Sequence, residues 1–184
     1  MQTDPEPKPI TTDRLILRRS VPDDAGMISS YRSDPDVHRY QGWERTDPDG
    51  IRLEIQEMAG RSPGESGGWV QFSVRERETD ALVGDVGLSP ADEPDVIKVG
   101  YTMAPAFQGR GYATEAVAAL VDYAFDTLGA DVVRAYASAE NTPSIRVAEK
   151  VGMRLMERFE HVYGDEVWHG VRYEIHRDGD RPPS

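Results

Sequence analysis

The chain has 184 residues, of which 38% are hydrophobic and 29% are charged. This length and balance suit one ordinary globular domain with a buried core, rather than a disordered chain. The sequence has no cysteine, which excludes disulfides, thiolate metal sites and a cysteine nucleophile. No apolar run approaches the roughly 20 residues of a membrane span, and the N-terminal residues lack the layout of a secretory signal. We therefore expect a cytoplasmic protein with no membrane partner.

The formal net charge is −12, from 33 acidic and 21 basic residues. A surface this acidic repels the phosphates of DNA and RNA, so a nucleic-acid partner is not expected. It favours cationic partners such as amines or basic peptides. The same charge can also serve solubility alone, because a total does not say where the charges lie.

The two ends of the chain differ in composition from the rest. Residues 1–9 and 177–184 are rich in proline and charge, which predicts disordered tails. Between them there is no linker, internal repeat or low-complexity block, so we expect a single domain over residues 10–176.

The first half of the chain predicts one strand, two helices and a three-stranded meander. The strand is Arg14–Arg18, and a helix starts at Pro22 with acidic residues in its first turn, where the helix dipole favours them. A second helix runs from about Pro48 to Ala59, with apolar residues at helical spacing. Turn-rich segments then separate three strands of an antiparallel meander, Trp69–Arg75, Ala81–Leu88 and Val96–Met103.

The second half predicts a long helix between two parallel strands. An apolar stripe runs from Ala113 to Leu128, and Gly129 suits the end of that helix. The strand Val132–Ala137 follows and should pair in parallel with the strand before the helix. A short helix over 142–151, with Thr142 as N-cap, and two closing strands near 153–162 and 166–176 complete the chain. The expected fold is α+β, with a mixed, mostly antiparallel sheet of about seven strands flanked by about four helices.

Two glycines stand where the long helix begins, in Gln108-Gly109-Arg110-Gly111-Tyr112-Ala113. The first amides of a helix have no intrahelical partner, and glycine lets an anion approach them closely. The stretch lacks the Gly-Lys-Ser/Thr of a P-loop and the third glycine of the dinucleotide fingerprint. Taken alone, it indicates an anion site or a plain turn equally well.

Three ordered motifs identify a resemblance. The glycine stretch matches the Q/R-x-x-G-x-G/A signature of the GNAT superfamily of N-acetyltransferases. The segment Val99–Pro105 looks like the superfamily's fourth strand, and Asn141–Met153 looks like its N-x-x-S…E-K-x-G-F segment, with Met153 in place of the phenylalanine. The resemblance extends from near Arg14 to near His176.

The resemblance implies acetyl-CoA as acetyl donor, without a metal. The pyrophosphate would lie on the backbone amides of Gln108, Gly109, Arg110, Gly111, Tyr112 and Ala113.

The rest of the coenzyme would then follow the fourth strand. Free backbone groups near Tyr101 and Met103 would pair with the pantetheine arm like an added strand. The Met103 N–H would polarise the thioester carbonyl, and Asn141 would bind the pantetheine. Three cations are candidates for the outer phosphates, although each could be a solvated surface residue instead, namely Arg110, Arg146 and Lys150.

Direct attack by an amine requires a base for the ammonium and an acid for the departing thiolate. Many members place a tyrosine seven residues after the asparagine as the acid, but here that position is Ala148. Ser144 lies in an N-x-x-S pattern that resembles the ribosomal-protein N-alpha-acetyltransferases (RimJ/RimL-type). That resemblance implies Ser144 as the acid and Glu160 as the base. Ser144 could equally cap its helix, and Glu160 could be a solvated edge residue.

The acceptor should meet loops near residues 37–50 and 160–170. The early loop also looks like that subgroup and offers Arg39, Tyr40 and Trp43 as substrate-binding residues. We expect an N-acetyltransferase acting on a primary amine, with a protein N-terminus favoured and an aminoglycoside or polyamine as the alternative. A non-catalytic acyl-CoA-binding module is the alternative of another class, and a homodimer is possible in this family.

Overall fold

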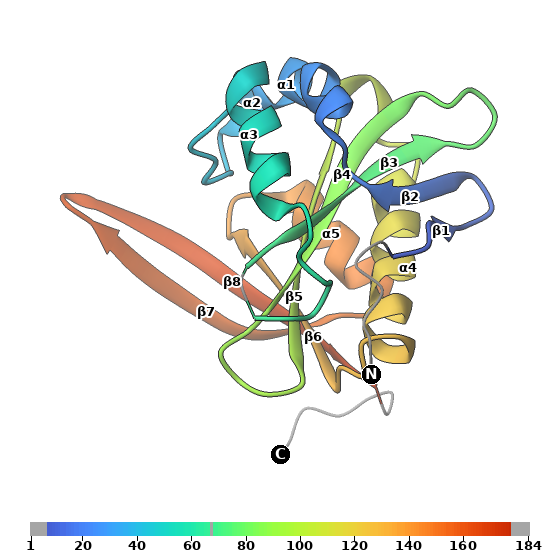
Figure 1. Cartoon of the computed structure of the whole chain (residues 1–184). Coiled ribbons are helices and arrows are strands. Elements are labelled where there is room, and N and C mark those ends of the chain that lie inside the picture. Colours follow the sequence, from blue (N-terminus) through green and yellow to red (C-terminus); the bar gives the residue numbers. More distant parts are fainter. Residues whose placement is uncertain (1–6, 67, 178–184) are drawn as a thin grey trace.

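The structure is a computed structural model that describes residues 7–66 and 68–177. The predicted tails lie mostly outside these residues. Within them the strands form one sheet in the order β1-β2-β3-β4-β5-β6-β8-β7 (Figure 1). The strands are β1 (Ile10–Thr11), β2 (Leu15–Arg19), β3 (Val70–Glu76), β4 (Leu82–Pro90), β5 (Val96–Met103), β6 (Val132–Ser138), β7 (Arg154–Tyr163) and β8 (Glu166–His176).

The predicted fold class is confirmed. Neighbouring strands are antiparallel, except that β5 and β6 pair in parallel across the helix that joins them. Over residues 7–66 and 68–177 the sheet has eight strands, one more than expected, because the two-residue β1 is too short to produce a period-2 pattern.

The helices follow the predicted positions, with differences at the start of the first helix and in two loops. The segment from Pro22 begins as a 3-10 turn (Pro22–Asp24) before the α-helix starts, and a one-turn helix in the early loop was not predicted. The α-helices are α1 (Ala25–Arg32), α2 (Pro35–His38), α3 (Pro48–Met58), α4 (Tyr112–Asp126) and α5 (Thr142–Val151), and a second 3-10 turn covers Pro105–Phe107.

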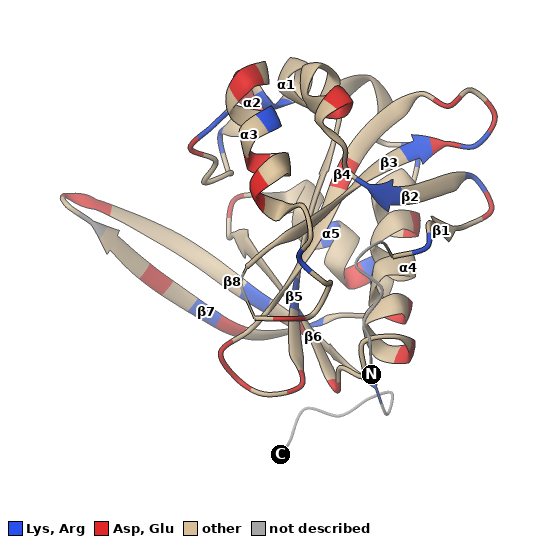
Figure 2. Ribbon diagram, viewed as in Figure 1, with Lys and Arg blue, Asp and Glu red and all other residues tan. Residues whose placement is uncertain are grey.

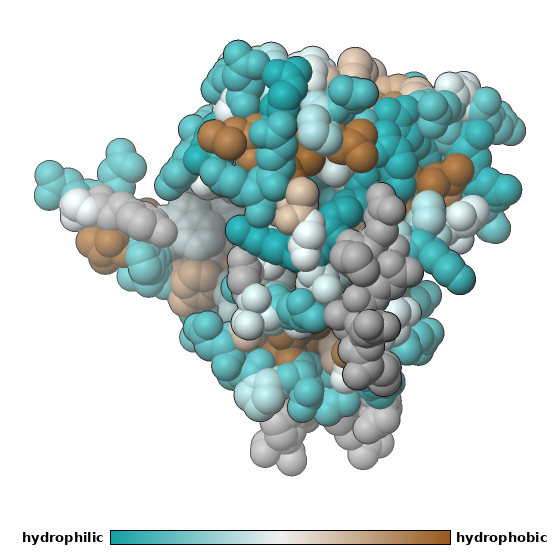
Figure 3. All heavy atoms as spheres, in the orientation of Figure 1, coloured by the Kyte–Doolittle hydropathy of each residue, from teal (hydrophilic) through white to brown (hydrophobic). Residues whose placement is uncertain are grey.

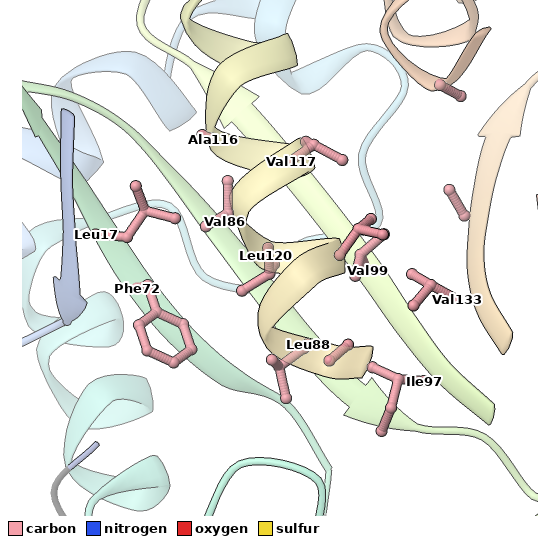
Figure 4. Packing of buried hydrophobic residues seen from close by; sticks show 14 of the residues in the cluster. Leu17, Phe72, Val86, Leu88, Ile97, Val99, Ala116, Val117, Leu120 and Val133 are labelled. Carbon is pink, nitrogen blue, oxygen red and sulfur yellow. The ribbon is translucent and has the colours of Figure 1, made fainter. Parts of the chain in front are cut away.

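The main core lies between one face of the sheet and the helices α4 and α5. Figure 4 shows Val117 and Leu120 of α4 packed over strand residues such as Phe72, Leu88 and Val99. These five side chains are almost fully buried. Burial of this apolar face fixes α4 against the sheet, and with it the position of the glycines at its start.

A smaller core lies between the opposite face of the sheet and the helices α1 and α3. It includes Ile28, Ile51 and Ile55, packed with Leu82. Side chains alternate along a strand. One face of the sheet around β5 therefore packs against α4 and α5, and the opposite face packs against α1 and α3.

The pairing of β5 with β6 stops at Val99 and Ala135. Beyond that point β5 continues beside β4 as far as Met103, while β6 continues beside β8 to Ser138. The two strands therefore separate, and residues 100–103 of β5 have a free backbone edge on the β6 side. This splay frees the backbone of β5 near Tyr101 and Met103, where the resemblance implied free backbone groups.

Charged side chains cover much of the remaining surface. Figure 2 shows acidic residues on α3, on α4 and along the β7–β8 hairpin, which projects from the body in Figure 1. The face seen in Figure 3 is mainly hydrophilic, with separate hydrophobic spots. Among the described residues, no helix is both long and apolar enough to cross a membrane.

Candidate active site

A cleft of about 390 Å³ lies where β5 splays from β6, between the start of α4 and α5. The free end of β5, the glycine stretch and the first turns of α5 contribute to its walls. Most of the predicted coenzyme residues line it, namely Tyr101, Met103, Gln108, Gly109, Gly111, Tyr112, Ala113, Asn141, Ser144, Arg146 and Lys150. Residues 37 and 41, from the early loop that was expected to meet the acceptor, and residue 36 just before that loop also line it.

The glycine stretch has the conformation that an anion site needs. Gly109 and Gly111 have φ angles of +74° and +79°, a region that residues with a Cβ rarely adopt. Gly111 is the N-cap of α4 and provides no side-chain cap. The first helix-start amide with an acceptor in the turn is that of Glu115, which donates to the Gly111 carbonyl at 3.0 Å. Within the described part of the chain, the amides of Tyr112, Ala113 and Thr114 have no backbone acceptor and are open to a negatively charged group. The Gln108 amide, which was also predicted to bind the pyrophosphate, instead donates to the Pro105 carbonyl at 3.3 Å.

The end of β5 is held next to this stretch. The Ala104 N–H donates to the Val83 carbonyl of β4 at 2.9 Å. Because backbone groups alternate in direction along a strand, the N–H groups of Met103 and Tyr101 point to the free edge. The Gln108 side-chain amide donates to the Met103 carbonyl at 3.1 Å. The donor groups predicted for the pantetheine arm therefore face the cleft.

The residue that caps α5 differs from the prediction. Asn141, not Thr142, is the N-cap of α5, and its Oδ1 accepts the Ser144 N–H at 3.3 Å. The Ser144 hydroxyl does not cap the helix. It donates to the Tyr101 hydroxyl oxygen at 3.1 Å, and that hydroxyl donates to the Ser144 carbonyl at 2.7 Å. Burial raises the pKa of Tyr101, so this hydroxyl keeps its proton at neutral pH.

The three candidate phosphate cations are not equivalent. Arg146 and Lys150 line the cleft. Arg110 is not among the described residues that line it; its guanidinium lies 5.3 Å from the centre of the Phe107 ring.

Glu115, in the first turn of α4, is a further charged residue beside the glycine stretch. Its carboxylate accepts the Thr12 hydroxyl at 2.6 Å, the Arg14 N–H at 2.9 Å and the Arg14 Nε at 2.7 Å. The Arg14 Nη1 in turn donates to the Arg110 carbonyl at 2.9 Å. Burial acts to raise the pKa of Glu115, but the hydrogen bonds from Thr12 and Arg14 outweigh it and the pKa is lowered. Glu115 thus ties the start of the chain to the glycine stretch.

A second cleft of about 280 Å³ lies on the opposite face of β5. It shares Gln41, Tyr101 and Thr102 with the first cleft. The rest of its wall comes from α1, α3, the strands β3 to β5, the loop between α2 and α3 and the residue before β3, namely Arg32, Gly42, Trp43, Glu54, Met58, Trp69, Gln71, Asp85, Gly87 and Gly100. The two clefts meet at the free edge of β5.

The predicted acceptor residues are distributed between these clefts. Tyr40 lines the first and Trp43 the second, whereas Arg39 is exposed and paired with Asp36 at 3.3 Å. Glu160 lies on β7, largely exposed, with His169 3.3 Å away. It is not among the described residues that line either cleft, nor is any other residue of 160–170. Its role as a base stays a prediction from the resemblance.

A splayed sheet, an uncapped helix start and a groove between them define the acetyl-CoA-dependent acyltransferases of this fold. The match to the family model of the acetyltransferase (GNAT) domain covers residues 14–154. The chain therefore belongs to the GNAT acetyltransferase family, and its acetyl donor is acetyl-CoA.

Relatives and solved structures agree with this membership. The chain is 33% identical over 145 residues to an uncharacterized N-acetyltransferase, p20, of Bacillus licheniformis, a match that covers 78% of this chain and 80% of the relative. A GNAT-family acetyltransferase from Bacillus anthracis superimposes with a TM-score of 0.83 at 27% identity, covering 92% of this chain and 99% of that one. A putative ribosomal-protein-serine acetyltransferase from Vibrio cholerae shares the fold, with a TM-score of 0.77 at 24% identity over 96% and 99% of the two chains.

Proposed function

We propose that this N-acetyltransferase transfers the acetyl group to a primary amine that enters through the second cleft, with a protein N-terminus as the favoured acceptor. The observation that carries the proposal is the meeting of the two clefts at residues 101 and 102 of β5. A donor in the first cleft and an acceptor in the second would approach each other through the splay between β5 and β6. The N-x-x-S pattern at Asn141 and Ser144 favours the N-terminal amine over a small cationic molecule.

The residues of the first cleft fit the donor. Acetyl-CoA supplies an acetyl group activated as a thioester. The open amides after Gly109 would bind the pyrophosphate, and Arg146 and Lys150 would bind the outer phosphates. The free edge of β5 would take the pantetheine amides as an added strand. The Met103 N–H points to that edge and would stabilise negative charge on the thioester oxygen.

Ser144 is our candidate for returning a proton to the coenzyme sulfur. Its hydroxyl lines the first cleft and is held in place by Tyr101. Ala148, at the position where many members carry a tyrosine acid, is 2% exposed and packed in the core. Tyr101 reaches the same cleft from β5 and positions the serine.

Two measurements test the proposal. Calorimetry should show acetyl-CoA binding by the folded protein. A thiol-release assay against peptides with free N-termini, aminoglycosides and polyamines should then give turnover with at least one N-terminal peptide. Binding of acetyl-CoA without thiol release from any amine would point to a non-catalytic acyl-CoA-binding protein instead.

A further inference from the structure

The second cleft has two tryptophan walls. The Trp69 ring lies over the backbone of β4 and β5, where a Cβ built at Gly87 or Gly100 would be 3.2 or 3.5 Å from it. Gly87 and Gly100 are register partners, so together they leave the flat area that the indole occupies. Trp69 remains 41% exposed, and Trp43 lines the same cleft. Large aromatic surfaces left open in a cavity favour an apolar or cationic group.

The charges in this cleft sum to one negative charge. Arg32 is 3% exposed, and its Nη1 and Nη2 lie 3.2 Å from a Glu54 oxygen and 3.5 Å from an Asp85 oxygen, respectively. One cation therefore faces two carboxylates. A single ammonium group would bring the net charge of the cleft to zero. A polyamine would bring further positive charges for which this cavity has no carboxylate partner.

The two carboxylates are not equally available. Asp85 accepts the Tyr31 hydroxyl and the Gln71 amide, the latter at 2.6 Å, and is 9% exposed in its side chain. The Glu54 side chain is 26% exposed. Only its Oε2 has a hydrogen-bond donor assigned among the described residues, namely Arg32. Glu54 is therefore the carboxylate that a ligand reaches.

Arg32 connects the charged side chains of this cleft to one of its aromatic walls. Its Nε is buried and has no hydrogen-bond partner within the described part of the chain; as an N–H donor it would not be satisfied by an ammonium group, which only donates. Its guanidinium lies 4.7 Å from the centre of the Trp43 ring, so it also supports one of the aromatic walls. An amine bound beside Glu54 would therefore lie next to Arg32, which contacts both the Glu54 carboxylate and the Trp43 ring.

We propose that the second cleft binds one singly charged primary ammonium carried on an apolar or aromatic group, with Glu54 holding the ammonium and the two indoles holding the apolar group. This rests on the proposed function and specifies its acceptor. A peptide with an apolar first residue and a free aromatic monoamine share this chemistry. Spermidine and aminoglycosides do not.

Binding is tested without turnover, on protein saturated with coenzyme A. A Trp168→Phe background leaves Trp43 and Trp69 as the fluorescent tryptophans. The probes are 2-phenylethylamine, a peptide with an N-terminal phenylalanine, and spermidine. We expect a saturable fluorescence change with the first two probes and at least about tenfold weaker binding of spermidine. Affinity for the peptide above that for the amine would identify the peptide as the source of the ammonium, and the reverse would identify the free amine.

The matched variants are Glu54→Gln and Glu57→Gln on the same helix. Glu57 pairs with Arg45 at 3.0 Å, is 49% exposed and is not among the described cleft residues. Glu54→Gln should weaken binding of 2-phenylethylamine by about tenfold or more, as expected for loss of a charged hydrogen-bond partner, and Glu57→Gln should leave it unchanged.

If Glu54→Gln fails to fold in a thermal melt, Trp43→Leu provides the second variant and should weaken the same probe. Equal affinities in the Glu54 and Glu57 variants, or spermidine binding as tight as that of 2-phenylethylamine, would overturn the proposal. Either result could occur with normal acetyl-CoA binding and thiol release, so it is distinguishable from failure of the proposed function.

Discussion

The hydroxyls of Tyr101 and Ser144 lie 3.1 Å apart across the gap between β5 and α5, and Tyr101 also donates to the Ser144 carbonyl at 2.7 Å. Tyr101 therefore fixes both the backbone and the side chain of the serine that we propose as the acid. This contact links the free edge of β5 to the first turn of α5, and both elements line the first cleft.

Ser144→Ala should lower kcat by about 100-fold, the lower range for loss of an acid catalyst, with little change in acetyl-CoA affinity. Tyr101→Phe should lower kcat by about tenfold, because the serine loses its orienting partner. The double variant should be no slower than Ser144→Ala, since the two residues act as a unit. Steady-state kinetics and calorimetry on the three variants measure this. Multiplication of the two single effects would show that Tyr101 does not act through Ser144.

Ionisation of Tyr101 should not limit activity near neutrality. Its pKa is raised by burial above the ordinary tyrosine value of about 10. A falling alkaline limb of kcat below about pH 10 should therefore appear equally in wild type and in Tyr101→Phe. A limb that disappears in the phenylalanine variant would contradict this assignment.

Gly111→Asp should abolish measurable acetyl-CoA binding, a loss of at least about 100-fold. It forces a side chain into a φ of +79° and adds negative charge where the pyrophosphate would bind. Gly129→Asp is the matched control, because Gly129 has a φ of +75° near the other end of α4 with open space beside it. Both variants carry similar backbone strain, so equal losses of affinity in calorimetry would assign the effect to folding.

Arg146→Ala and Lys150→Ala should each weaken acetyl-CoA binding by a few fold, and more at low salt, since both cations line the cleft. Arg110→Ala should have a smaller effect, because its guanidinium lies over Phe107. Calorimetry at two ionic strengths separates the three. A larger loss for Arg110 than for Arg146 would contradict the assignment of the outer phosphates to Arg146 and Lys150.

The residues of the first cleft could be predicted from sequence to lie together because its parts are local. Gly109 and Gly111 stand directly before a strongly amphipathic helix, and Asn141 stands directly before another, with Ser144 in its first turn, so spacing along the chain determines spacing in the structure. The N-cap of α5 was predicted one residue late. Thr142 and Asn141 are both good caps, and only the observed hydrogen bond to the Ser144 N–H distinguishes them.

The second cleft could not be predicted in the same way. Arg32, Glu54 and Asp85 come from α1, α3 and β4, and only the tertiary fold brings them together. Asp85 lies in a strand made mainly of apolar residues and glycine. Its position in the sequence does not indicate which residues it contacts. The 160–170 hairpin was expected at the acceptor site, but none of its described residues lines either cleft. The sequence predicts where the turn lies along the chain, whereas the direction in which the hairpin projects depends on the twist of the sheet.

Glu115→Gln should destabilise the protein by about 1–2 kcal/mol at pH 7, because the amide cannot replace a carboxylate that accepts hydrogen bonds from Thr12 and Arg14. The pKa of Glu115 is lowered in the folded state, so its contribution is fully present above the ordinary glutamate value of about 4.3 and is lost as the pH falls through the folded value. The difference in free energy of unfolding between wild type and variant should therefore be largest near neutrality and shrink below about pH 4. Urea titrations at several pH values measure it, with Asp122→Asn, an exposed position on the same helix, as the control. A difference that grows as the pH falls would contradict the role of Glu115 in tying Arg14 to the glycine stretch.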